Sequence, residues 1–202
     1  MERLKGLGGF PEELGIDLSK PEGRFQWFLA SLLFAKRISF EIAMRTIKVF
    51  QAKGLTTPDA VRKAGWSRLV EALDEGGYVR YDFSTASIIL EALKLLRDRY
   101  GDDVDRIHEE ALSPEDLEAR LREFKGYGPV AVNIFLRELR GLWTKAKPKP
   151  PRLALHVGRR LGLNKAEIEE LEPCLVKLAL KYCKRMRCDD CPVKNYCKGI
   201  EL

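Results

Sequence analysis

Four cysteines near the end of the chain form its densest group of metal-ligating side chains, with the spacing C-x4-C-x2-C-x5-C. Disulfides form in oxidising compartments, and the opening residues MERLKGLGGF lack the apolar core of a secretory signal. We therefore expect these thiols to bind metal. An all-cysteine set in one short loop suits a [4Fe-4S] cluster, and zinc is the alternative because it also accepts four thiolates. The predicted ligands are Cys183, Cys188, Cys191 and Cys197.

A second candidate site lies in the segment LREFKGYGPVAVNIFLREL, where two glycines separate two amphipathic helical patterns. The first pattern ends at Phe124, and the second begins after Gly128. Glycine permits a tight turn and lets the backbone approach a ligand closely. The first N–H groups of the second helix have no partner within that helix, and the helix dipole makes them attractive to anions. The pattern predicts a phosphate site at Lys125, Gly126, Tyr127 and Gly128; a plain helix–helix turn is the alternative.

Composition agrees with a nucleic-acid partner without requiring one. The chain has 202 residues, a formal net charge of +6 and a pI near 9.1. A basic balance favours binding to nucleic acid, although some basic proteins bind none. No apolar run approaches the roughly 18 residues needed to span a membrane. We expect a cytoplasmic monomer, nucleoid-associated if prokaryotic, and the scarcity of Asn and Gln among many charged residues leans toward a thermophile.

The elements that must position these groups are predicted to be helices throughout. Apolar residues from Phe25 to Leu33 recur with helical spacing. Thr57, Ser113 and Asn164 each precede a helical pattern as N-cap residues, and Ser84 or Asp82 is expected to cap a helix that Gly101 ends. Cys174 falls within another apolar helical pattern and is expected to be a small buried hydrophobe. The proline- and lysine-rich stretch 144–152 is predicted to be an irregular basic linker.

The hairpin and the cysteine loop together resemble the endonuclease III superfamily of helix-hairpin-helix DNA glycosylases. The similarity also includes LLFAKRIS, GYVRYDFSTASIILEALKLL and RLALHVGRRLGL, so it covers most of the chain. The first cysteine gap is four residues, where the familiar pattern has six. The resemblance implies an all-α fold of two lobes: a six-helix barrel over 33–142, with the hairpin at about 114–140, and a cluster lobe made of 1–32 plus 143–202, with its iron-sulfur loop at 183–197.

The same resemblance implies a function in base-excision repair, in which double-stranded DNA binds across a cleft and a damaged base is flipped into it. Two departures put the chemistry in question. Val130 stands where the family has its nucleophilic lysine. When the segment around His156 is aligned with the family, Ala154 stands where the family has its aspartate. A hydrocarbon neither attacks a sugar nor stabilises its cation. Enzyme activity is therefore left open, and His156 is expected to be packed or hydrogen-bonded.

Three readings of function follow. The chain recognises damaged or distorted DNA without the usual cutting; or it is an active glycosylase with relocated catalytic residues; or it is a redox or interaction protein built around the cluster. The weak catalytic candidates are Asp82, Glu138 and Lys36, for which capping or ion pairing is the alternative role. The expected DNA contacts are Lys36, Arg37, Lys125, Gly126, Tyr127, Gly128, Val130 and Arg159.

Overall fold

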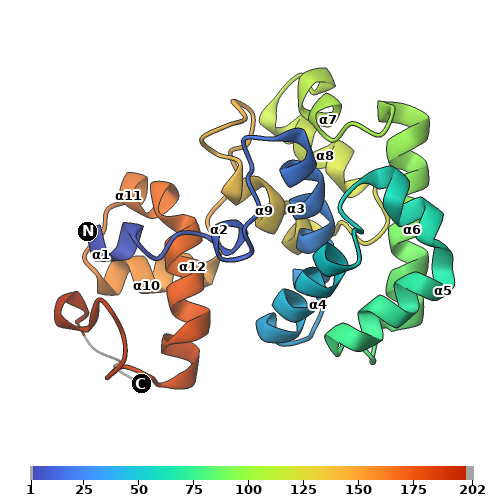
Figure 1. Ribbon diagram of the computed structural model, residues 1–202. Helices are drawn as coiled ribbons and strands as arrows, with labels where there is room; N and C mark the ends of the chain where they lie inside the picture. The colour runs from blue at the N-terminus through green and yellow to red at the C-terminus, as the bar shows by residue number, and fades with distance from the viewer. Residues whose placement is uncertain (1, 199–202) are drawn as a thin grey trace.

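The protein is described by a computed structural model, in which residues 2–198 are described and all the regular secondary structure among them is helical (Figure 1). This confirms the all-α prediction. The described residues form twelve α-helices and two short 3₁₀ helices and contain no β-strand. In chain order they are Glu2–Lys5 (α1), Phe10–Glu13 (α2), Pro21–Phe34 (α3), Phe40–Ala52 (α4), Pro58–Gly76 (α5), Asp82–Tyr100 (α6), Asp105–Glu110 (α7), Pro114–Arg122 (α8), Pro129–Glu138 (α9), Arg152–Arg160 (α10), Lys165–Glu170 (α11), Glu172–Lys181 (α12), Cys183–Arg185 (η1) and Lys194–Tyr196 (η2).

Local sequence signals explain most of the helix ends. The side chains of Thr57, Ser113 and Asn164 each accept a backbone N–H in the first turn, as predicted, and Asn164 forms a full capping box with Glu167. Helix α6 is a correction. Its N-cap is Tyr81, because Asp82 is already helical and accepts the N–H of Phe83 at 2.6 Å.

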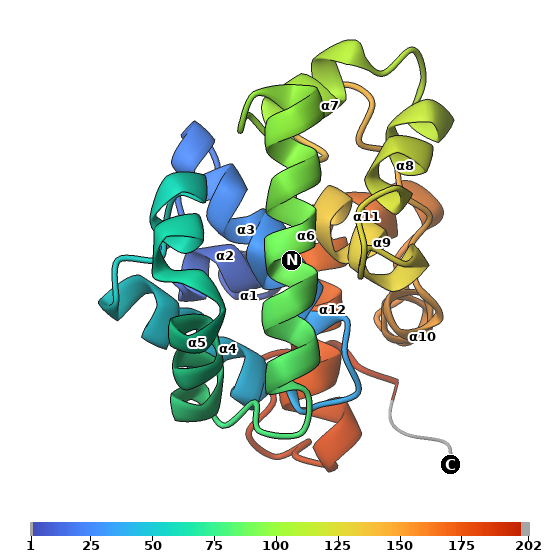
Figure 2. The same cartoon turned by 90° about the vertical axis from the view of Figure 1, so that its right-hand side faces the viewer.

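Two hydrophobic cores organise these helices. The larger core gathers buried residues from Phe10 to Ala146, and the smaller core joins Leu4 to residues from Ala154 to Val193. In Figure 1, α3 to α9 lie together on one side, and α1, α10, α11 and α12 lie on the other. Figure 2 shows α6 running the length of the larger group, and α6 packs mainly against α5.

The division between the cores differs from the boundaries predicted at residues 32 and 142. Helix α3 belongs as a whole to the larger core, because nearly all of its faces are buried there, including Trp27 at 0% exposure. Trp143 and Ala146 also pack into that core. By packing, the chain therefore passes between cores before Phe10 and after Ala146.

Buried charges tie the two cores together. Arg140, just beyond α9, donates to the carboxylate of Glu172 on α12, whose side chain is fully buried. Lys177, also on α12, donates to the carbonyls of Leu7 and Gly9 at 2.6 and 3.0 Å. These contacts pair charges that would otherwise be costly to bury, although Arg140 Nε and Glu172 Oε1 lack a partner within residues 2–198. They fix α12 against both α9 and the N-terminal segment.

The predicted linker 144–152 is irregular as far as residue 151, with Arg152 already the first residue of α10, and it is held in place along its length. Asn133 on α9 donates to the carbonyl of Lys149 at 2.8 Å, and Arg140 donates to that of Pro148 at 2.6 Å. At the start of the stretch, Lys145 donates to the carbonyl of His108, whose ring stacks on Trp143. The linker therefore forms a fixed wall beside α9 instead of a loose connector.

Candidate nucleic-acid interface and cysteine loop

The turn between α8 and α9 depends on glycine at one of its two glycine positions. Gly126 has φ of +87°, a left-handed conformation that L-residues adopt at a cost. A Cβ atom added there would also lie 2.7 Å from the Cγ2 atom of Ile88 on α6. Both facts show that the fold itself requires glycine at this position.

Gly128 has no such structural reason to be glycine. Its φ of −72° suits any residue, and an added Cβ would meet nothing within 4 Å. Gly128 is the N-cap of α9, and no side chain caps the backbone donors of that first turn. Val130, in the same turn, is 60% exposed. The start of α9 is therefore open, with room for an anion to come close to the backbone.

Tyr127 and Lys125 differ from what the sequence predicted for them. The Tyr127 side chain is only 2% exposed, stacks on Phe28 with ring centroids 4.5 Å apart, and donates its hydroxyl to the Phe28 carbonyl at 2.6 Å. It anchors the hairpin to α3 and cannot reach a ligand. Lys125 is exposed but donates to Glu91 at 2.7 Å, so its charge is partly matched within the chain.

A pocket of about 530 Å³ lies between the two cores and borders the start of α9. We call it the intercore pocket. Its walls are mainly apolar and come from both cores, with cations and one amide among them and no Asp or Glu among the described residues that line it. They are Phe10, Phe34, Ile38, Phe40, Pro129, Val130, Asn133, Ile134, Arg137, Lys149, Pro151, Leu153, Val176, Leu180 and Lys184.

The two positions that the resemblance assigns to catalysis have different surroundings. Val130 lines the intercore pocket. Ala154 is fully buried in the smaller core, and its neighbour Leu153 is the residue that lines the pocket. The pocket wall therefore carries neither a lysine from the hairpin nor an acid from α10.

Glu138, a catalytic candidate from the sequence, is buried at the junction of the cores and does not line the intercore pocket. Burial, with smaller contributions from the nearby carboxylates Glu172 and Glu12, raises the pKa of Glu138 to about 7, against the lowering effect of Arg137. Its Oε1 atom lies 3.5 Å from Arg137 Nε without forming a hydrogen bond. This carboxyl group therefore has no access to a substrate in the pocket.

The raised pKa of Glu138 predicts a pH-dependent effect of Glu138→Gln on stability. The folded protein holds a proton on Glu138 up to about pH 7, whereas an unfolded glutamate releases it near its ordinary value of 4.5. Wild-type stability should therefore fall between about pH 4.5 and 7 on account of this group. We expect Glu138→Gln to gain stability relative to wild type as pH rises from 5 to 8, by up to roughly 3 kcal/mol at 1.36 kcal/mol per pKa unit.

Urea unfolding followed by helical circular dichroism at pH 5 and pH 8 measures this difference. The exposed Glu71→Gln serves as a control and should show the same small effect at both values. A Glu138→Gln effect that does not change with pH would contradict the assignment.

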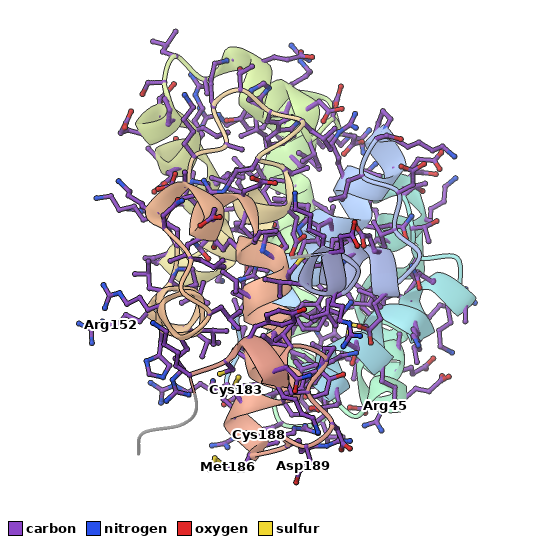
Figure 3. All side chains as sticks on the ribbon, turned by 90° about the vertical axis from the view of Figure 1, so that its left-hand side faces the viewer. Arg45, Arg152, Cys183, Met186, Cys188 and Asp189 are labelled. Atoms are coloured by element: carbon purple, nitrogen blue, oxygen red, sulfur yellow. The ribbon has the colours of Figure 1, made fainter. Side chains whose placement is uncertain are left out.

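The remaining predicted contacts lie on the surface around the pocket or away from it. Arg37 is exposed and Lys36 half-buried in the turn between α3 and α4. Arg159 is exposed on α10, as is His156, which corrects the expectation that this histidine is packed. Figure 3 shows Arg152, at the start of α10, projecting away from the body of the molecule. Asp82 lies at the start of α6, beside Asp74, and does not line the intercore pocket.

The four C-terminal cysteines lie in one loop after α12, in which η1 and η2 are the only regular turns (Figure 3). Burial raises the pKa of Cys183, and the charges of Cys191, Cys197 and Cys188 also raise it. Within residues 2–198, however, no three Cys, His, Asp or Glu side chains converge closely enough to hold a metal ion. The donor set fits a four-thiolate group in number and kind, but metal binding requires these side chains to draw together.

The loop also contacts the larger core. Arg185 pairs with Glu41 on α4, and its guanidinium lies 5.3 Å from the centroid of the Phe40 ring. Lys184, beside it, lines the intercore pocket. Sequence reasoning missed these contacts, as it missed Phe34, Phe40 and Arg137 as pocket residues, because nothing in the local pattern shows which distant segments meet.

Comparison with known proteins adds no identity. No protein-family model matches the chain, and no curated protein matches its sequence.

No helix in the part of the chain that the structure describes is long and apolar enough to cross a membrane.

Proposed function

We propose that this chain is a DNA-binding protein with the fold of the endonuclease III superfamily, which recognises damaged or distorted duplex DNA through an extruded nucleotide. One observation carries the proposal. Pro129 and Val130 belong both to the open first turn of α9 and to the lining of the intercore pocket. A DNA phosphate bound at that first turn would therefore place its nucleotide at the pocket.

Charge around this junction supports a polyanionic partner. Lys149 and Lys184 line the pocket, and Arg152 and Arg159 lie exposed on α10, whose preceding residue Pro151 also lines it. Cations placed this way contact phosphates without reading sequence. The apolar side chains Phe34, Phe40 and Leu153 suit a flat, desolvated base better than a phosphate or an ion.

The pocket walls argue against cutting by the usual route. Hydrolysis of a glycosidic bond needs a carboxylate to stabilise the sugar cation or to activate water, and none lines the pocket among residues 2–198. One specific observation favours a second candidate function: Lys149 and Lys184 are in the lining, and either amine would be placed to attack a sugar carbon. That alternative is a glycosylase-lyase with a relocated lysine.

We propose that the cysteine loop carries a [4Fe-4S] cluster through Cys183, Cys188, Cys191 and Cys197, with zinc as the alternative. The bound group would draw the four thiolates together and stiffen the loop. Its role at this site is structural: it would hold Lys184 and Arg185 against the larger core, where they contact the pocket and α4. Anaerobically purified protein should be brown with iron and colourless with zinc.

The proposal is tested by binding and excision assays on one set of duplexes that contain uracil, oxidised, alkylated, mismatched or abasic sites. We expect binding that weakens by about 0.9 log units per phosphate contact for each log unit of salt, and no release of base. Robust base release would overturn the non-cutting proposal. A covalent adduct trapped by borohydride, and lost in Lys149→Met or Lys184→Met, would establish the lysine alternative.

A further inference from the structure

Two aromatic side chains form a contacting pair on the surface and belong to neither hydrophobic core. Trp66, on α5, is 43% exposed, and Phe83, in the first turn of α6, is 60% exposed. Their ring centroids lie 5.4 Å apart, with 34° between the ring planes. The Trp66 Nε1 atom donates to the Ser87 hydroxyl at 3.0 Å. The indole is therefore held in place, and what it presents to a ligand is its apolar ring.

The backbone leaves the helical conformation just before Trp66. Helix α5 packs along α6 (Figure 2), but at Gly65 it is broken, with φ of +70° and ψ of 178°. This conformation is accessible essentially to glycine alone. A Cβ atom at Gly65 would meet nothing within 4 Å, so no close neighbour requires glycine there. The break weakens α5, and it sets the direction in which the chain enters Trp66.

The aromatic pair lies on the same side of α6 as the hairpin. Phe83, Ser87 and Glu91 recur at every fourth residue, so they form one stripe along that helix. Phe83 and Ser87 contact Trp66, and Glu91 accepts from Lys125 of the hairpin at 2.7 Å. At about 1.5 Å per residue, the two ends of this stripe are about 12 Å apart along the helix axis. That distance matches about three or four nucleotides of a strand that rises about 3.4 Å per nucleotide.

The surroundings of the pair suit a nucleic acid. Apart from Val79, the exposed residues that follow Trp66 and flank Phe83 in the chain are polar or basic: Ser67, Arg68, Arg80 and Ser84. The carboxylate of Asp82, which is half-buried, accepts the Phe83 N–H at 2.6 Å. Cations attract the phosphates of a strand, and exposed aromatic rings stack on its bases.

The size of the patch argues against a protein partner. A stable interface between proteins buries roughly 1,200 Å² or more, and two rings beside one valine cannot supply that area. A single base, by contrast, needs only one aromatic face to stack on.

We infer that the Trp66–Phe83 pair is a stacking site for an unpaired base of DNA, about three or four nucleotides along the strand from the phosphate bound at the hairpin. This inference rests on the proposed DNA-binding function and adds to it a class of substrate: duplex DNA that continues into a single strand. Every base has a π face, so the site should prefer unpaired nucleotides and show little preference among sequences.

The test compares two DNAs that differ only in the bases of a single-stranded end. Both carry the same duplex and an extension of about six nucleotides, made of thymines in one and of stable abasic analogues in the other, so their phosphates are identical. By fluorescence anisotropy at fixed salt, we expect the thymine extension to bind about fivefold or more tightly, the lower limit for one stacked base. An adenine extension should bind within about threefold of the thymine extension.

Tryptophan fluorescence reports on the same site directly. Of the three tryptophans in the chain, Trp27 and Trp143 are only 0% and 6% exposed, so a base can stack only on Trp66. The thymine extension should quench part of the emission, and the abasic extension should not. Trp66→Phe keeps an aromatic ring, so it should lose the quenching and still prefer the thymine extension.

Phe83→Ala removes one ring of the pair from a mostly exposed position. It should lower the affinity for the thymine extension to that for the abasic extension, with helical circular dichroism unchanged. Leu112→Ala is the matched control, because Leu112 is 89% exposed in the turn between α7 and α8. This variant should keep the preference.

The outcomes separate this inference from the function on which it rests. Equal wild-type affinity for the thymine and abasic extensions overturns the stacking site and leaves duplex binding standing. Absence of salt-sensitive binding to any DNA overturns both. Equal affinities together with self-association that Phe83→Ala abolishes, measured by sedimentation, would assign the pair to contact with a second copy of this chain. If a variant unfolds, the comparison of the two extensions on the wild-type protein still decides the question.

Discussion

Gly128→Ala is expected to leave the stability of the protein within about 0.5 kcal/mol of wild type while weakening its binding to duplex DNA about tenfold or more. An added Cβ meets nothing within 4 Å in the free protein. The loss of a preferred N-cap residue is offset by the reduced freedom of the unfolded chain. In the complex, the same methyl group would stand where a phosphate must approach the first turn of α9, and a charge-assisted hydrogen bond lost there is worth about 1.5–3 kcal/mol.

Gly126→Ala is the matched control, two residues away in the same turn, and should behave in the opposite manner. Its positive φ and the 2.7 Å approach to Ile88 make the substitution destabilising by about 2 kcal/mol or more. For a chain of this size that corresponds to a fall in melting temperature of roughly 5 °C. Thermal melts and anisotropy titrations on both variants measure the two effects. If Gly128→Ala binds DNA as well as wild type does, the hairpin is only a turn.

Cys188→Ser is expected to abolish the bound metal group while leaving the helices intact. Cys188 is exposed and belongs to neither hydrophobic core, so its replacement removes a ligand without creating a cavity. We expect iron content, or zinc content under the alternative, to fall to near zero by elemental analysis, with helical circular dichroism unchanged. DNA affinity should fall as well, because Lys184 and Arg185 would no longer be held against the pocket and α4.

Cys174→Ala provides the comparison for that experiment. Cys174 is buried in the smaller core, as the sequence predicted, and stands apart from the loop. This variant should keep its full metal content and lose a little stability, since a buried thiol is replaced by a smaller side chain. Equal metal content in wild type and Cys188→Ser would show that the loop is not the metal site.

The accuracy of sequence reasoning depended on how local each signal was. Thr57, Ser113 and Asn164 were identified as caps because the donor, the acceptor and the helix start lie within four residues. The start of α6 was placed one or three residues late, since Asp82 and Ser84 carry the same chemical signal as a true cap. Helix α3 was divided between lobes because its pattern shows burial but not the partner against which it is buried.

Within the candidate site the same limit applies to single residues. The sequence does not distinguish Gly126 from Gly128. The positive φ of Gly126 and its approach to Ile88 show which glycine the fold requires. The motif predicts that Tyr127 contacts DNA, but its ring is buried in the larger core. Arg137 has no distinguishing context until α9 is packed between the two cores.

The sequence by itself determined the helical character, most of the caps, the hairpin and the presence of four clustered cysteines, because each depends on residues that are near one another along the chain. Only the tertiary structure decided that the start of α9 opens onto a pocket, that no carboxylate from the described part of the chain lines it, and that Arg137 is buried in its wall. Those properties depend on how segments from Phe10 to Lys184 come together, and packing between distant segments is set by the shape of the whole core.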